Sequence, residues 1–222
     1  MSTALIIGAS RGIGREFVRQ LLAAGWQVHA TARKDADVAA LTAAGAHGFK
    51  LDVTQPQSLA GLGWQLDGAE LDLAVYVAGL YGPQTGASHA PTTEDFDQVM
   101  HANVLGAMQA IPLVAPLLEA QGGQFAFLTS AMGSIADVQA STAWLYRASK
   151  AALNMVVRSA ACEWPKVTMI AVSPGWVQTD MGGPGAPLTV QDSVAGMLRA
   201  FSMLPRGDTG CFVDHTGKML PW

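Results

Sequence analysis

The chain has 222 residues, 50% of them hydrophobic, which is enough to bury a sizeable core and excludes a disordered or low-complexity protein. Lys and Arg total 13 against 17 Asp and Glu, and no segment concentrates the positive charge, which argues against nucleic-acid or membrane-surface binding. Cys162 and Cys211 lie far apart in no metal-ligand spacing, which excludes a disulfide scaffold and suits a reducing compartment.

The first elements alternate between a buried strand and an amphipathic helix. Residues 4–7 are a short apolar run, typical of a strand buried on both faces. Apolar residues then recur at helical spacing over residues 13–22, until Gly25 ends the pattern. Residues 28–32 predict a second strand.

Further cycles of strand and helix follow. Strands are expected at residues 48–51, 71–77, 124–128, 167–172 and 211–213. Helices are expected near residues 57–66, from about Thr93, over residues 151–163, and after Thr189, which has the spacing of a cap with Asp192. This order predicts one α/β domain over residues 1–222, a doubly wound parallel sheet of about seven strands with helices on both faces. Ligands of such folds bind beyond the carboxyl ends of the strands.

No apolar run approaches the roughly 18 residues that a membrane span needs. Residues 4–7 are also too short for the core of a signal peptide and follow no basic region. A soluble cytoplasmic protein is therefore expected.

A glycine-rich turn joins the first strand to the first helix. Gly8, Gly12 and Gly14 have the spacing G-x-x-x-G-x-G, which lets a pyrophosphate approach free N–H groups at the helix start. A turn without a ligand is the alternative in a chain with 24 glycines. The position between strand and helix favours a dinucleotide site.

The end of the second strand indicates which dinucleotide binds. An acidic residue there would bind the ribose 2′-hydroxyl of NAD, but this chain has Arg33. Arg11, inside the glycine turn, would bring a second guanidinium to a 2′-phosphate. NADP(H) is therefore the expected cofactor, and two ordinary surface cations are the alternative.

Tyr146 and Lys150 stand four positions apart, so a helix would place them on one face. An ammonium beside a phenol favours phenolate and lowers the phenol's pKa, as an acid–base catalyst requires. Alone, this pair could equally be a surface pair. Ser130, just after a predicted strand, and Asn103, inside the long helix, supply a context for catalysis.

Together these positions make the sequence resemble the short-chain dehydrogenase/reductase family over nearly its whole length. The resemblance is carried by Gly8/Gly12/Gly14, Asp52-Val53, Ala78-Gly79, Asn103-Val104, Ser130, Tyr146/Lys150 and Ser173-Pro174-Gly175. Within the family the chain looks most like the compact C-factor and sniffer-type carbonyl reductases, through residues 132–135, 146–155 and 174–181.

The resemblance implies a Rossmann fold and a role for each site residue. Tyr146 would protonate the substrate oxygen, or act as base in reverse, while Lys150 would lower its pKa and bind the nicotinamide ribose. Ser130 would hydrogen-bond the carbonyl oxygen, and Asn103 would hold a water that links Lys150 to solvent. The residues expected at the cofactor are Gly8, Ser10, Arg11, Gly12, Ile13, Gly14, Arg33, Asp52, Val53, Ala78, Gly79, Tyr146, Lys150, Pro174, Gly175, Val177 and Thr179.

The sequence departs from the family pattern in two places. Tyr76 and Val77 stand where many members have two Asn, which puts in doubt a hydrogen bond that braces the central sheet. The interval from Ser130 to Tyr146 is a few residues longer than is common. An inserted turn near residues 136–141 would absorb it, and Ser134 is the second candidate for the serine role.

The remaining predictions concern metals, substrate and assembly. The five histidines show no ligand spacing, so no metal is expected. Trp144, Trp176 and Met181 neighbour the expected site and are candidates to line an apolar substrate cleft. Relatives commonly pair through the helices expected here at residues 100–118 and 151–161, which implies a homodimer or a tetramer.

The expected function is the reversible, NADPH-dependent reduction of an aldehyde or ketone of a small molecule to an alcohol. No nucleic-acid or membrane partner is expected. The alternative is a catalytically weak NADP-binding signalling or scaffold protein of the C-factor type. The sequence does not identify the substrate, because the loop at residues 182–187 is short and chemically quiet.

Overall fold

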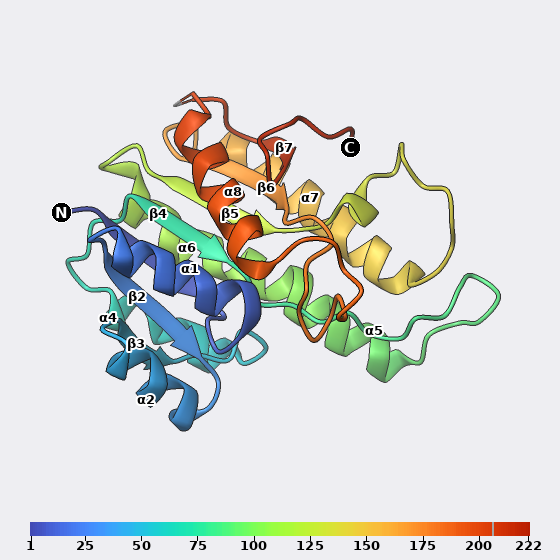
Figure 1. The fold of residues 1–222 in the computed structure, drawn as a ribbon, viewed down its shortest axis with the longest axis horizontal. Helices are drawn as coiled ribbons and strands as arrows, with labels where there is room; N and C mark the ends of the chain where they lie inside the picture. The colour runs from blue at the N-terminus through green and yellow to red at the C-terminus, as the bar shows by residue number, and fades with distance from the viewer. Residues whose placement is uncertain (206) are drawn as a thin grey trace.

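All seven strands form one parallel sheet in the computed structural model, which describes residues 1–205 and 207–222. The strands are β1 (Thr3–Ile7), β2 (Gln27–Ala32), β3 (His47–Lys50), β4 (Leu73–Tyr76), β5 (Gln124–Leu128), β6 (Thr168–Ser173) and β7 (Cys211–Asp214). Their order is β3-β2-β1-β4-β5-β6-β7, and every neighbouring pair is parallel (Figure 1). This arrangement confirms the predicted single doubly wound domain.

The strands lie close to their predicted positions, with one clear difference. The strand expected over residues 71–77 is confined to Leu73–Tyr76. At its start, the Leu71 N–H bonds to the carbonyl of Leu117 in a helix rather than to a strand. Leu71 therefore belongs to the connection that leads into β4, although it is fully buried.

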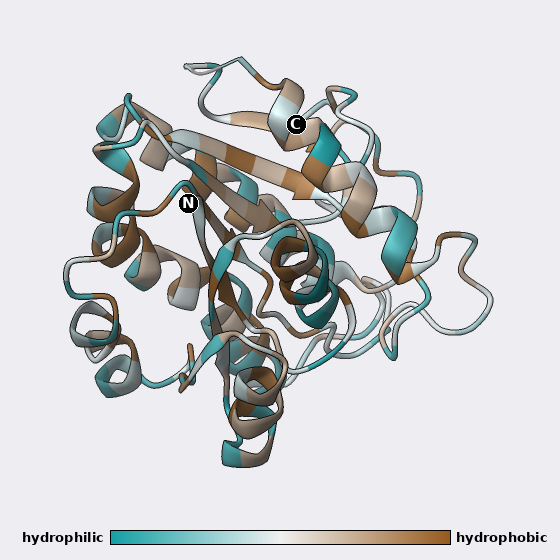
Figure 2. Ribbon diagram, turned by 60° about the vertical axis from the view of Figure 1, so that its left-hand side comes forward, coloured by the Kyte–Doolittle hydropathy of each residue, from teal (hydrophilic) through white to brown (hydrophobic). Residues whose placement is uncertain are grey.

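Helices cover both faces of the sheet. On one face lie α1 (Gly12–Ala23), α2 (Asp35–Ala43) and α8 (Val190–Met203); α1 and α8 are in front of the sheet in Figure 1. On the other lie α3 (Pro56–Ala60), α4 (Leu62–Gln65), α6 (Gly106–Glu119) and α7 (Trp144–Glu163). Because both faces are covered, alternate strand side chains enter two separate cores, and the hydrophobic strands run through the middle of Figure 2.

Two helical segments differ from the prediction. Helix α2 was not predicted, because Leu41 is its one buried residue and the segment has no apolar period. The helix expected near residues 57–66 is divided into α3 and α4, with Gly61 between them. Pro56 begins α3, where its fixed φ is favourable and its missing N–H costs no hydrogen bond.

The long helix expected from Thr93 is continuous but irregular. It consists of α5 (Thr93–Met100), a π-helical segment η1 (His101–Leu105) and α6. Thr92 caps its start by accepting a hydrogen bond from the Asp95 N–H, at 3.0 Å. Thr93–Glu119 is the one stretch in the described chain long and apolar enough to cross a membrane by length and composition, yet 56% of its most apolar window is buried in the fold, as in a core helix.

Helix α7 begins earlier than the segment predicted over residues 151–163 and therefore contains both Tyr146 and Lys150. It starts after Ala143, whose φ of 56° is left-handed and is the one positive φ of a non-glycine residue in the described chain. Thr189 caps α8 as predicted, accepting a hydrogen bond from the Asp192 N–H at 3.1 Å.

Candidate active site

A cavity of about 430 Å³ opens beyond the carboxyl ends of the strands. It lies where the strand order reverses between β1 and β4, the place where doubly wound sheets bind ligands. Every residue expected at the cofactor lines this cavity except Gly14, Gly175 and Val177. Residues from the whole length of the chain therefore meet at one edge of the sheet.

The glycine turn is packed backbone against backbone. Gly8 has a φ of +94°, and a Cβ there would lie 2.8 Å from the Ala78 nitrogen. A Cβ on Gly14 would lie 2.1 Å from the Gly8 carbonyl oxygen, so this glycine is required by packing rather than by contact with the cavity. Thr31 fixes the turn from β2, because its hydroxyl accepts the Gly8 N–H at 3.0 Å.

Two arginines line the cavity at the expected ribose end, and they differ in whether the guanidinium is paired with Asp180. Arg33 is exposed at the end of β2 and lines the cavity. Arg11 also lines it, but its guanidinium forms an ion pair with Asp180, and both side chains are about three-quarters exposed (73% and 74%). Asp52 is engaged locally: its Oδ1 accepts the Thr54 N–H at 3.0 Å and the Thr54 hydroxyl at 2.7 Å.

These features fit a phosphorylated dinucleotide. The turn presents bare backbone at the start of α1, where unpaired N–H groups attract a phosphate. Gly12 lies close to Thr179, since a Cβ on it would be 3.5 Å from the Thr179 Cγ2, so a side chain there would narrow the path along the cavity. Arg33 supplies a cation where a 2′-phosphate would lie.

Lys150 and Tyr146 lie in the deep part of the cavity, both buried on α7. The Lys150 Nζ donates a hydrogen bond to the Leu128 carbonyl at 2.7 Å and is 5.5 Å from the centroid of the Tyr146 ring. Burial lowers the pKa of Lys150 to about 8. It also raises the pKa of Tyr146, although a hydrogen bond with Ser130 acts in the opposite direction.

The pKa of Tyr146 therefore moves in the direction opposite to the prediction. From the sequence, the Lys150 ammonium is expected to lower this pKa. In the structure the loss of water around the buried phenol is the largest influence, and the one group that lowers the pKa is Ser130. Burial also disfavours the charged form of Lys150, which weakens the effect expected from an ammonium.

Ser130, rather than Ser134, is hydrogen-bonded to Tyr146. It caps the short 3₁₀ helix η2 (Ala131–Gly133), and its Oγ accepts the Met132 N–H at 3.1 Å. The Ser134 hydroxyl instead donates to the Trp222 carbonyl at 3.3 Å and accepts the Asp137 N–H at 3.2 Å. It holds the exposed turn that absorbs the longer interval before Tyr146.

Asn103 connects the loop after β4 to α7. It is fully buried; its Oδ1 accepts the Leu80 N–H at 2.7 Å, and its Nδ2 donates to the Leu80 carbonyl and to the Ser149 Oγ, each at 2.9 Å. A Cβ on Gly79 would lie 3.1 Å from the Asn103 Oδ1 and 3.6 Å from the Lys150 Nζ. Gly79 therefore packs closely against both side chains. The expected water between Asn103, Lys150 and solvent stays a prediction.

Tyr76, which stands where many family members have Asn, makes a hydrogen bond to a helix beside the site. Its buried hydroxyl donates to the Ala102 carbonyl at 2.9 Å. Ala102 belongs to the π-helical segment that also carries Asn103, so this bond ties β4 to the helix next to the site.

Several important residues were not predicted. Thr31, Ser149 and Tyr81 hold the glycine turn or Tyr146. Ser149 lies between Tyr146 and Lys150 in the Tyr-Arg-Ala-Ser-Lys run, whereas Thr31 and Tyr81 belong to no motif. The hydroxyl two residues before Arg33 was the one available signal for Thr31. Of the three residues expected to line an apolar substrate cleft, Met181 lines the cavity, whereas Trp144 and Trp176 do not. The Trp176 indole instead donates to the Gly182 carbonyl at 2.8 Å.

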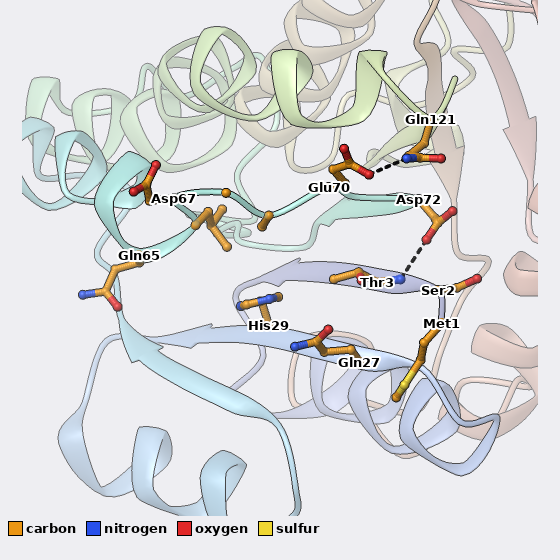
Figure 3. Close-up of a pocket in the computed structure, with 13 residues that line it drawn as sticks. Met1, Ser2, Thr3, Gln27, His29, Gln65, Asp67, Glu70, Asp72 and Gln121 are labelled. Carbon is orange, nitrogen blue, oxygen red and sulfur yellow. Dashed lines mark hydrogen bonds between the residues drawn. The ribbon is translucent and has the colours of Figure 1, made fainter.

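A larger cavity of about 650 Å³ lies at the opposite edge of the sheet, among the amino-terminal ends of β1 and β2 (Figure 3). Its polar groups bind one another: the Thr3 N–H donates to the Asp72 Oδ2 at 2.8 Å, and the Gln121 amide donates to Glu70 at 2.6 Å. None of the predicted site residues lines it. The candidate active site is therefore the smaller cavity.

Comparison with known proteins gives one consistent result. The family model described as "short chain dehydrogenase" matches residues 2–186. The C-signal protein of Myxococcus xanthus is 42% identical over 132 residues, which cover 58% of this chain and 79% of the relative.

Solved structures agree. A short-chain dehydrogenase/reductase of Burkholderia multivorans with bound NADP is 34% identical, covers 100% of this chain and 99% of its own, and superposes with a TM-score of 0.91. A carbonyl reductase of Pseudomonas aeruginosa PAO1 in complex with NADP is 33% identical over 100% of both chains, with a TM-score of 0.85.

Proposed function

The chain belongs to the short-chain dehydrogenase family, and from this premise we propose that it is an NADPH-dependent carbonyl reductase acting reversibly on a small aldehyde or ketone. The resemblance seen in the sequence is thereby confirmed, as is the relation to carbonyl reductases, and the chain is an oxidoreductase. The observation that carries the proposal is the buried Tyr146 beside Ser130 and Lys150, at the end of a cavity suited to a dinucleotide.

The cofactor is NADP(H). The relatives from Burkholderia and Pseudomonas were solved with NADP, and Arg33 stands here where an NAD enzyme would have an acidic residue. Gly8, Ser10 and Gly12 would hold the pyrophosphate, with Arg33 at the 2′-phosphate. When bound, the cofactor supplies the hydride that reduces the carbonyl carbon. Arg11 would join Arg33 if its ion pair with Asp180 opens.

Ser130 and Tyr146 would act on the substrate oxygen. The Ser130 hydroxyl would donate to the carbonyl and stabilise the negative charge that develops there. The Tyr146 hydroxyl would give its proton to the same oxygen. Because burial raises the pKa of Tyr146, the phenol is fully protonated at neutral pH and is ready to act as the acid in the reductive direction.

Lys150 and Asn103 would support the proton donor. Lys150 would bind the ribose next to the nicotinamide, and its ammonium would stabilise the phenolate left after proton transfer. With a pKa of about 8, Lys150 still carries its proton in most molecules at pH 7. Asn103 holds the backbone near both groups and would retain the proton-relay water that the family resemblance implies.

The similarity to C-signal supports a second candidate function, that of an NADP-binding signalling protein. A signalling protein could retain the cofactor cavity and bind NADP without much turnover. The presence of Ser130 beside the buried Tyr146 and Lys150 favours the enzyme, because binding alone would not require a proton donor.

We also propose a homodimer in the cytoplasm that works without nucleic acid or membrane. Exposed apolar side chains lie along the helices that relatives commonly use for pairing: Phe96, Leu105, Met108 and Met155. Both cysteines are free, with Cys162 exposed, as suits a reducing compartment.

The test is NADPH oxidation, followed by absorbance, with a panel of aldehydes, ketones and diketones. Turnover of several compounds, and the reverse reaction with NADP and the product alcohol, would support the reductase. Tight NADPH binding with no turnover across the panel would contradict it and favour the binding protein.

A further inference from the structure

Tyr81 lies against Tyr146 although no family motif includes it. It follows the Ala78-Gly79 pair in the loop after β4 and is half-buried. Its ring centroid is 4.6 Å from that of Tyr146, and the planes are tilted by 45°. Such tilted aromatic pairs add about 0.5–1.5 kcal/mol to the burial of their surfaces. The proposed proton donor thus packs against a second phenol.

One hydrogen-bonded network holds the backbone beside each of the two tyrosines. Asn103 binds both the N–H and the carbonyl of Leu80, the residue before Tyr81. The same amide donates to the Ser149 Oγ, and the Ser149 hydroxyl donates to the Tyr146 carbonyl at 2.8 Å. The backbones beside both tyrosines are therefore fixed to one buried side chain.

The other side of Tyr81 is fixed by packing. Gly82 has a φ of +70°, and a Cβ there would lie 2.6 Å from the Val99 Cγ2. Only glycine combines this left-handed backbone with such a close approach. The loop that carries Tyr81 is thus seated on α5 as well as on Asn103.

We propose that Tyr81 is a positioning residue: its ring holds the Tyr146 phenol in the orientation in which it meets Ser130 and the substrate oxygen. This inference rests on the proposed reductase function. Tyr81 does not line the cofactor cavity, so its effect passes through Tyr146 rather than through cofactor binding. The hydroxyl of Tyr81 has a second effect, because its charge interaction raises the pKa of Tyr146.

The experiment compares Tyr81→Leu, which removes the ring, with Tyr81→Phe, which removes the hydroxyl alone. Tyr81→Leu should lower kcat at least about tenfold while the Kd for NADPH stays within about twofold, since a misplaced catalytic group costs rate rather than binding. Tyr81→Phe should keep most of kcat. The part of its pH profile of kcat that reports the titration of Tyr146 should move to lower pH, because the interaction that raises this pKa is lost. Trp64→Leu, at an aromatic residue 83% exposed on α4, is the control.

A second measurement does not depend on turnover. The chain has 3 tyrosines, so ¹³C-labelled tyrosine gives a simple NMR spectrum in which Tyr146→Phe assigns the Tyr146 signal. That signal should shift in Tyr81→Leu and not in Trp64→Leu. If it does not shift in Tyr81→Leu, or if kcat and its pH profile match the parent, the inference is wrong. Failure of the parent to reduce any carbonyl contradicts the proposed function, while the NMR result still decides the contact.

Discussion

At the scale of single residues, the proposed preference for NADP(H) depends on two arginines. Arg33 is exposed and lines the cavity at the end of β2, whereas Arg11, which was expected to act beside it, is paired with Asp180. An exposed ion pair contributes only about 0–1 kcal/mol, so a 2′-phosphate can compete for Arg11. Arg33 needs no such exchange and should dominate selectivity.

Arg33→Asp should therefore weaken NADPH binding at least about tenfold and leave NADH binding nearly unchanged, since a phosphate contact is lost and a repulsive charge is added. Titration of cofactor fluorescence gives both Kd values. Arg199→Asp, an exposed position on α8, makes the same charge change away from the cavity and should affect neither. An equal loss for both cofactors in Arg33→Asp would exclude a contact with the 2′-phosphate.

Burial of Lys150 should contribute to the pH dependence of stability. Its pKa falls from 10.5 unfolded to about 8 folded, so between these values the unfolded chain binds more protons and the free energy of unfolding rises with pH. The rise should reach up to about 3 kcal/mol. Urea unfolding from pH 7.5 to 10 should show this rise in the parent and not in Lys150→Met, whose unbranched side chain is one atom shorter and carries no charge. Identical pH slopes would contradict the buried lysine.

At the level of elements, the site depends on how closely η2 packs against α7. A Cβ on Gly133 would lie 2.9 Å from both the carbonyl carbon and the Cβ of Lys150. This close approach brings the 3₁₀ turn that Ser130 caps onto the helix that carries Tyr146. The sequence placed both residues in motifs but gave no sign of this contact.

Gly133→Ala should separate η2 from α7, lower the free energy of unfolding by about 1–3 kcal/mol and reduce kcat, because Ser130 would move away from Tyr146. Gly63→Ala is the matched control, because it lies in α4 with nothing within 4 Å of the added Cβ. It should be neutral or stabilising by about 0.5–1 kcal/mol. Denaturant unfolding and steady-state kinetics measure both; equal behaviour of the two variants would show that the contact is unimportant.

The elements that the sequence predicted are those with a strong pattern. A buried strand such as β1 is marked by its own apolar residues, and the start of α8 is marked by its capping residue, so both are visible in the local sequence. Helix α2 has one buried residue, and the π-helical segment η1 depends on how Tyr76 and Leu80 meet it, so neither has a local signature. The pKa of Tyr146 was mispredicted for the same reason, because its burial is created by distant segments.

For the whole molecule, the order of the sheet follows from alternation of strand and helix, and the active site follows from that order. The oligomeric state does not follow from the sequence in the same way. An exposed apolar face indicates that its burial would be favourable, but the number of copies depends on the shape of the partner surface. Met108 on α6 is 53% exposed and Met155 on α7 is 66% exposed, on helices that pack together on one face of the sheet.

The parent should therefore sediment as a dimer, and Met108→Lys combined with Met155→Glu should shift it towards monomer, because burying a charge in an apolar interface is costly. Sedimentation velocity at several concentrations measures the state. Met203→Lys, at an exposed methionine at the end of α8, is the control and should stay dimeric. A monomeric parent, or a double variant that remains dimeric, would place the pairing surface elsewhere.

In the proposed reaction the Tyr146 hydroxyl transfers the proton to the substrate oxygen. The direct measurement is single-turnover oxidation of bound NADPH by the best panel substrate in the parent and in Tyr146→Phe. The variant should bind NADPH like the parent and lose at least about 100-fold in rate. A Tyr146→Phe rate within about tenfold of the parent would remove Tyr146 from the role of acid.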